Sequence, residues 1–271
     1  MYLVKAAAFV AAMLVGCADA HAEPSASVVD FETPLSRSQP LQGYLRQPAG
    51  AGPSPAVVLL HSCNGSAQRL DERWGKLIAS WGYVTLTVDS FGPRGLKNTC
   101  SDGAVVDLAL DATRALGFLV QQRFVDPSRV AVLGFSQGAW QALSSVERGM
   151  VERTSPNKFR AAIAFYPHCL GFKGDMTVPT LVLIGELDDW SLATECRNMV
   201  DGRDDWGISR QKYQGVPIKL IVYPGAYHAF DAPGLTTPVQ LLGHRLEYNA
   251  SATDQSMSAV QEFLKEQIGG N

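Results

Sequence analysis

The sequence has no internal repeat, no long run of charges of one sign and, throughout its length, no run of 18 apolar residues. These absences exclude a repeat architecture and a membrane-spanning helix. Net charge is also small, because 23 Lys and Arg against 26 Asp and Glu give −3, so nothing calls for nucleic acid or an anionic membrane as a partner. With 46% hydrophobic and 18% charged residues among 271, the chain is not disordered and can bury a sizeable core.

The first residues, 1–22, have the pattern of a signal peptide. A positive charge precedes the apolar run Ala6–Val15, which is too short to span a bilayer. Two processing routes fit. Residues before Cys17 resemble a bacterial lipobox, which predicts cleavage before Cys17 and a lipid anchor there; alternatively, a small-residue site predicts cleavage after Ala22. Either route predicts an exported protein, periplasmic or in the cell envelope. Membrane attachment is expected only by the first route, through the lipid anchor at Cys17.

The remaining chain, 23–271, alternates strand-like apolar runs with longer amphipathic stretches, and no Pro/Ser-rich linker divides it. This alternation predicts a single α/β domain with a mostly parallel, doubly wound sheet. Catalytic side chains are then expected just past the carboxyl ends of strands. We expect strands at 56–60, 83–88, 130–135, 161–165, 181–184 and 218–223, helices at 71–80, 105–121, 137–147 and 254–267, a turn at Asp126-Pro127, and an antiparallel pair at 28–31 and 41–46.

Ser136 is the candidate nucleophile. It is the central residue of a G-x-S-x-G pattern, Gly134–Gly138, which alone is a weak signal. Its context strengthens the signal, because the pattern joins the expected strand 130–135 to the expected helix 137–147. That strand–elbow–helix arrangement presents the Ser hydroxyl above the sheet. The plain alternative is a serine that caps the helix.

A serine nucleophile needs a base and an orienting carboxylate, expected here in the chain order Ser, acid, His. Asp188 follows the expected strand 181–184 and is the predicted acid, with Asp189 as its close rival. His228 follows the expected strand 218–223 and is the predicted base. His244 is its rival, but no strand is expected before it.

Five segments of the sequence carry a family resemblance: His61–Gly65, Asp89–Gly95, Gly134–Gly138, Gly185–Asp188 and Gly225–Phe230. Together they resemble the dienelactone hydrolase family of the α/β-hydrolase superfamily, and the resemblance runs from about residue 41 to 267. It is nearest to an exported, cysteine-paired branch. It implies an α/β-hydrolase fold, and the expected triad chemistry needs no cofactor and no metal. By resemblance, Cys63 and Gln137 would supply the two oxyanion N–H groups. His61 is expected to shape their loop rather than to carry a proton, because the order of the triad along the chain already places the base at His228.

The chain departs from the family's name-giving enzymes at three positions. Their nucleophile is Cys, where this chain has Ser136. Their oxyanion loop carries a Glu that regulates that Cys, where this chain has Ser62. They bind a substrate carboxylate with an Arg four residues after the catalytic His, where this chain has Ala232, while Arg94 matches their other carboxylate-binding Arg.

Four cysteines follow the signal sequence, and sequence alone does not choose among their three connectivities. The expected fold does choose. Cys63 and Cys100 follow two strands that are neighbours in this fold, and Cys169 and Cys196 follow two consecutive strands, so each pair emerges at one edge of the sheet. We therefore predict the disulfides Cys63–Cys100 and Cys169–Cys196.

Together these features predict a serine hydrolase that acts on small carboxylic esters, lactones or thioesters. The alternative is a catalytically weak hydrolase-fold binding protein in the cell envelope. Lid domains of this superfamily are commonly inserted where this chain has only Tyr166–Pro179, too few residues for an independent lid. Loop side chains that follow strand ends are then expected to line the substrate pocket, namely Phe91, Arg94, Tyr166, His168 and Trp190.

Overall fold

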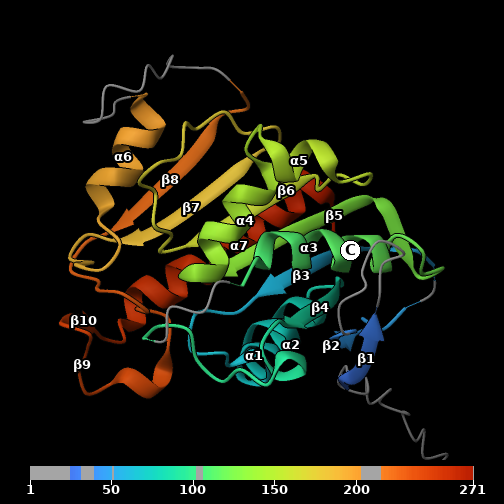
Figure 1. Cartoon of the computed structure of the whole chain (residues 1–271), viewed down its shortest axis with the longest axis horizontal. Helices are drawn as coiled ribbons and strands as arrows, with labels where there is room; N and C mark the ends of the chain where they lie inside the picture. Colours follow the sequence, from blue (N-terminus) through green and yellow to red (C-terminus); the bar gives the residue numbers. More distant parts are fainter. Residues whose placement is uncertain (1–24, 32–39, 51, 102–105, 203–214, 271) are drawn as a thin grey trace, which may run out of the picture.

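An eight-stranded sheet forms the centre of the molecule (Figure 1). The structure is a computed structural model, and it describes residues 25–31, 40–50, 52–101, 106–202 and 215–270. The signal sequence and both of its predicted cleavage sites lie outside these ranges. Within them, no helix is both long enough and apolar enough to cross a membrane.

The strand order across the sheet is β1-β2-β4-β3-β5-β6-β7-β8. From β4 to β8 all neighbours pair in parallel, while β1 and β2 form the predicted antiparallel pair at one edge. The mostly parallel α/β fold predicted from the alternation is therefore confirmed. The strands are β1 (Ser27–Phe31), β2 (Leu41–Arg46), β3 (Ser54–Leu60), β4 (Val84–Asp89), β5 (Val125–Phe135), β6 (Ala161–Phe165), β7 (Thr180–Gly185) and β8 (Ile218–Tyr223).

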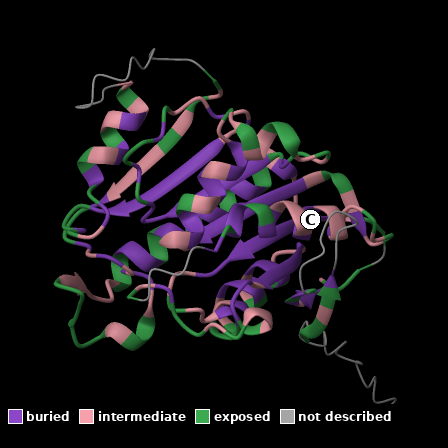
Figure 2. Cartoon of the chain, in the orientation of Figure 1, coloured by how far each residue is buried: buried purple, intermediate pink, exposed green. Residues whose placement is uncertain are grey.

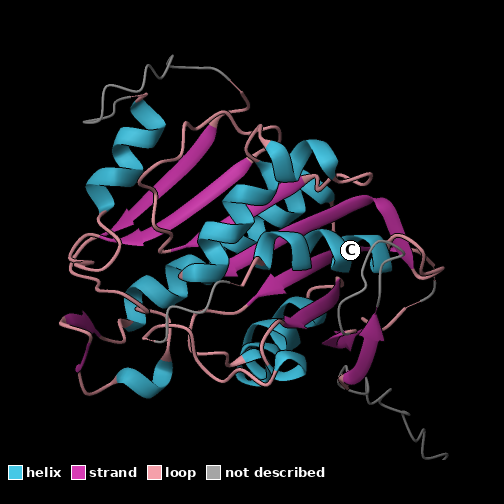
Figure 3. Cartoon of the chain, viewed as in Figure 1, coloured by secondary structure: helices cyan, strands magenta, loops and turns pink. Residues whose placement is uncertain are grey.

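Helices cover both faces of this sheet, so its central strands are buried on both sides (Figures 2 and 3). The connection from β3 to β4 crosses the sheet in the opposite direction from the later strand-to-strand connections. Because such connections are right-handed, the helices between β3 and β4 lie on the face opposite α3 and α4. The helices are α1 (Ala67–Leu70), continued through a π-helical turn (Asp71–Gly75) into α2 (Lys76–Ser80), then α3 (Leu108–Leu119), α4 (Gln137–Val146), α5 (Met150–Thr154), α6 (Ala193–Asp201) and α7 (Ala250–Ile268).

Two local predictions were wrong, and one expected helix begins earlier than the sequence indicated. The helix expected at 71–80 begins at Ala67, and its π-helical turn directs Asp71 into the core, where the carboxylate binds buried Arg46. Asp126-Pro127 is not a turn between elements but lies inside β5, where the pairing with β3 shifts its register. The segment before His244 does contain a strand, because β9 (Val239–Leu241) and β10 (His244–Leu246) form a small hairpin.

The segment between β6 and β7, Tyr166–Pro179, contains no helix or strand, as the absence of a lid domain requires. A different segment borders the carboxyl edge of the sheet instead. Along the chain, the hairpin β9–β10 follows β8 and precedes α7. In space it stands apart from the central sheet (Figure 3).

The structure contains both predicted disulfides. Cys63–Cys100 joins the loop after β3 to the loop after β4, and Cys169–Cys196 joins the segment after β6 to helix α6. The paired cysteines are 37 and 27 residues apart. Closing loops of this length stabilises a fold by roughly 3–4 kcal/mol each in the chain-entropy treatment. Disulfides of this kind persist in oxidising compartments, as expected for an exported protein.

Candidate active site

Ser136 lies at a sharp elbow between β5 and α4. Its φ of +53° is in a region that side-chain-bearing residues rarely adopt, and such strain is concentrated at functional sites. Two glycines make the elbow sterically feasible. A Cβ at Gly134 would collide with the backbone of Gly138, and a Cβ at Gly138 would collide with the backbone at Leu60. The glycines of the pattern thus let α4 approach the end of β3 closely.

Three of the sequence-predicted residues form one continuous hydrogen-bonded row. The Ser136 hydroxyl is 3.1 Å from Nε2 of His228, and Nδ1 of His228 is 2.9 Å from Oδ2 of Asp188. The second carboxylate oxygen, Oδ1, accepts the backbone N–H groups of Trp190 and Ser191 at 3.0 and 2.8 Å. With Nδ1–H donated to the carboxylate, Nε2 is left as an acceptor facing the serine hydroxyl. This is the geometry that a general base requires.

The two neighbouring carboxylates after β7 have different partners. Asp188 is buried and faces His228, whereas Asp189 accepts the backbone N–H of Arg245 at 3.1 Å and lies 3.7 Å from the ring of His244. Asp189 therefore holds the hairpin β9–β10 against the loop after β7. The geometry distinguishes the two candidates that the sequence left open.

Two of the predicted pocket residues pack against the imidazole of His228. The ring centroid of Trp190 is 5.2 Å away and that of Tyr166 is 4.7 Å away. The Tyr166 hydroxyl donates to Asp231 at 2.6 Å, and burial raises the pKa of this phenol well above its ordinary value. Asp231 also accepts from Trp74 Nε1 at 2.9 Å. Tyr166 is thus a buried support for the imidazole, tied to a carboxylate that the sequence analysis missed.

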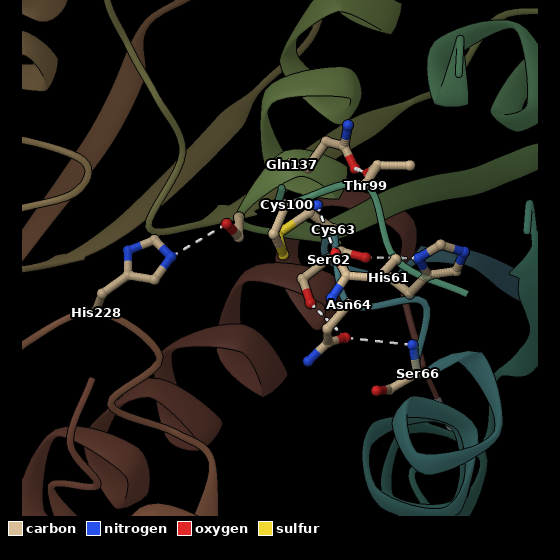
Figure 4. The surroundings of a disulfide bond; sticks show 11 residues. His61, Ser62, Cys63, Asn64, Ser66, Thr99, Cys100, Gln137 and His228 are labelled. Atoms are coloured by element: carbon tan, nitrogen blue, oxygen red, sulfur yellow. Dashed lines mark hydrogen bonds between the residues drawn. A yellow bond between two sulfur atoms is a disulfide. The ribbon is translucent and has the colours of Figure 1, made fainter. Parts of the chain in front are cut away.

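The predicted oxyanion donors come from two elements that meet beside Ser136. Gln137 is the first residue of α4, where a backbone N–H has no partner within the helix. Cys63 belongs to the loop directly after β3, whose strand pairs with β5 along the register Leu60 to Gly134. Figure 4 shows these two residues near one another, with the imidazole of His228 across from them.

The sequence model of the dienelactone hydrolase family matches residues 41–268. The chain belongs to the dienelactone hydrolase family. Membership identifies it as a carboxylic ester hydrolase, and it places the elbow, the imidazole and the carboxylate in a hydrolase fold.

Solved structures resemble this dienelactone hydrolase family member over most of their length. The crystal structure of a dienelactone hydrolase-like promiscuous phosphotriesterase from metagenomic libraries superposes with a TM-score of 0.69 at 21% identity, covering 90% of this chain and 99% of that one. A putative dienelactone hydrolase from Klebsiella pneumoniae gives 0.64 at 16%, covering 89% and 99%. A thermophilic esterase from Thermogutta terrifontis gives 0.65 at 18%, covering 90% and 93%. At these identities the likeness shows the shared fold.

The other three predicted pocket residues of this family member are engaged elsewhere. Phe91 is buried and packs against the ring of His61. The Arg94 guanidinium makes two hydrogen bonds to Asp111, at 2.7 and 2.8 Å, which occupy the face that a substrate carboxylate would need. His168 is half-exposed and lies 3.6 Å from Glu195. Each follows a strand end, but tertiary partners determine where its side chain points.

His61 connects the oxyanion loop to the loop after β4. Its Nδ1–H donates to the Ser62 carbonyl at 2.8 Å, and its Nε2 accepts the Ser90 backbone N–H at 3.2 Å. A protonated imidazole could not accept the Ser90 N–H. Burial lowers the pKa of His61 below its ordinary value of 6.5, which favours the neutral form of the ring.

Acidification should therefore destabilise the fold through His61. As pH falls through the ordinary value of 6.5, the unfolded chain takes up a proton that the folded chain resists, so the free energy of unfolding should decrease. The measurement is urea unfolding at about pH 7.5 and about pH 5, comparing wild type with His61→Gln, which cannot titrate. The variant should lose less stability between the two pH values. Equal losses in both proteins would show that His61 does not contribute.

Proposed function

We propose that this protein is a serine hydrolase of small carboxylic esters, lactones or thioesters, with Ser136, His228 and Asp188 as its catalytic triad. The single observation that carries the proposal is the unbroken hydrogen-bonded row from the Ser136 hydroxyl through His228 to Asp188. The position of these three residues supports the same function, because each of them follows a strand end at the carboxyl edge of the sheet.

The proposed reaction follows from the order of these contacts. Ser136 Oγ attacks the carbonyl carbon while its proton passes to Nε2 of His228, and Asp188 stabilises the resulting imidazolium. The backbone N–H groups of Cys63 and Gln137 stabilise the oxyanion of the tetrahedral intermediate. His228 then returns the proton to the leaving alcohol or thiol. Water, deprotonated by the same imidazole, releases the acid and restores the Ser136 hydroxyl.

We also propose that the protein is exported and works in the periplasm or cell envelope. The two disulfides support this location, since cytosolic thiols are kept reduced. The pattern of residues 1–22 supports it independently. Cleavage before Cys17 would leave a lipid-anchored protein, and cleavage after Ala22 a soluble one.

The substrate class is best tested with p-nitrophenyl esters of increasing acyl length. The 14 residues of Tyr166–Pro179 carry no helix or strand to enclose a long chain, so little apolar surface is available beyond a short acyl group. Each methylene left in water forgoes about 0.8 kcal/mol of binding. We expect kcat/KM to be highest from acetate to butyrate and to decrease towards palmitate. A kcat/KM that rises from butyrate to palmitate would contradict the short-acyl preference, and no hydrolysis of any ester would contradict the proposed function.

A further inference from the structure

The segment just before Cys100 contacts both proposed oxyanion donors. The backbone N–H of Thr99 donates to the Cys63 carbonyl at 2.8 Å, and the Thr99 hydroxyl donates to Oε1 of Gln137 at 3.0 Å. Cys100, the next residue, forms the disulfide with Cys63. Figure 4 shows Thr99 next to the amide oxygen of the Gln137 side chain, with the disulfide lower in the view. One short stretch of chain thus links the loop after β3 to the start of α4.

The oxyanion loop after β3 also packs closely against the segment that precedes Cys100. Gly65, at the end of the oxyanion loop, has a φ of +67°, and a Cβ there would lie 2.6 Å from the Lys97 carbonyl oxygen. The polar side chains of the loop bond within it, since the Asn64 side chain accepts from the Ser62 hydroxyl and the Ser66 backbone N–H. Residues 97–100 thus contact both the loop that carries Cys63 and the first residue of α4.

The two disulfides differ in exposure. Cys63 and Cys100 are both partly exposed, whereas Cys169 and Cys196 are 1% and 0% exposed. Thiol–disulfide exchange requires a thiolate to reach a disulfide sulfur, so access decides which bond a small thiol reduces first. The disulfide beside the proposed oxyanion hole is the accessible one.

We propose that Thr99 and the Cys63–Cys100 disulfide form a clamp that sets the spacing of the oxyanion donors, and that small-molecule thiols switch turnover down by opening it. This inference rests on the proposed function. Thr99 is a positioning residue, because it acts through Cys63 and Gln137 rather than on substrate. In the opening step one thiolate attacks a sulfur of the disulfide, giving a mixed disulfide and one free cysteine. A second thiolate releases the other cysteine and leaves the oxidised thiol dimer, a two-electron reduction of the protein.

Dithiothreitol treatment of the full-length oxidised protein tests the switch. Removal of one oxyanion donor costs about 10²–10³ in turnover. Reduction displaces the donors without removing them, so the loss should be smaller. We expect kcat to fall by about 10- to 100-fold with little change in KM. The disulfide-free variant Cys63→Ser/Cys100→Ser should start low and no longer respond. The matched control Cys169→Ser/Cys196→Ser lacks the buried disulfide and should respond as wild type does. Unchanged kcat in protein whose Cys63 and Cys100 are shown to be reduced by peptide mapping would overturn the clamp.

A trifluoromethyl ketone separates the clamp from the function on which it rests. Such a ketone adds to an activated serine, and its oxyanion occupies the hole. We expect tight inhibition of the oxidised protein and inhibition weakened at least tenfold after reduction. No inhibition of the oxidised protein would overturn the proposed function and the clamp with it. Equal inhibition before and after reduction would overturn the clamp alone.

Thr99 variants decide the matter if reduction unfolds the protein, because they leave the disulfide in place. Thr99→Val loses the hydroxyl that reaches Gln137 and should lower kcat several-fold, with KM little changed. Thr99→Ser keeps the hydroxyl and should restore kcat. Equal kcat in Thr99→Val and wild type would overturn the positioning role.

Discussion

Ser136→Ala should lower kcat for ester hydrolysis by about 10⁵- to 10⁶-fold, as expected when the nucleophile of an acting triad is removed. The side chain contributes little to the fold. Its hydroxyl bonds to His228, and the elbow is shaped by backbone contacts such as the Ser136 N–H to the Phe165 carbonyl at 3.0 Å. The thermal unfolding midpoint should consequently stay within a few degrees of that of wild type. Initial rates on p-nitrophenyl butyrate and a thermal melt measure the two quantities.

Either of two results would count against this nucleophile. A rate within tenfold of wild type would show that another group attacks the carbonyl. A large loss of rate accompanied by a collapse of the melting transition would show that Ser136 is needed for folding rather than for chemistry.

Asp188→Asn should lower kcat by about 10⁴-fold, because an amide can donate to Nδ1 and so favours the imidazole tautomer that cannot accept the serine proton. The adjacent carboxylate supplies a matched control. Asp189 has the same charge and lies one residue away, but it binds the backbone of Arg245 and not His228. Asp189→Asn should therefore change kcat by less than about tenfold, an effect on the hairpin rather than on the base.

The comparison of the two variants is the informative quantity. If Asp189→Asn lost as much activity as Asp188→Asn, or more, the assignment of Asp188 as the orienting acid would be wrong. The rates of both variants should be measured at the same pH.

The sequence could predict the placement of the three proposed triad residues because a strand end is a strong local signal. Ser136, Asp188 and His228 each follow a strand rich in Val, Leu or Ile, and parallel strands bring such ends to one edge. The same reasoning predicted how the four cysteines pair, because the loops after neighbouring parallel strands lie at the same edge of the sheet. It also favoured His228 over His244, although His244 does lie on a strand, β10.

Side-chain direction could not be predicted in this way. Arg94 follows a strand end but points to Asp111, on α3, and nothing local in the sequence announces that pair. Asp231 accepts hydrogen bonds from Tyr166, Arg73 and Trp74, which lie 65 to 158 residues away in the sequence. Its role as the support behind His228 therefore exists only in the folded chain. The hairpin β9–β10 has two three-residue strands that are mostly or partly exposed, too short for a clear alternation of apolar residues.

The central claim is that Ser136 is an activated nucleophile, and covalent labelling tests it most directly. A fluorophosphonate probe reacts with a serine hydroxyl only when a neighbouring base has activated it. Incubation of the purified protein with the probe, followed by peptide mapping, should find a single modified residue, Ser136. Labelling should disappear in Ser136→Ala and in His228→Ala. Absence of label in the folded wild-type protein, or label on a different serine, would contradict the account.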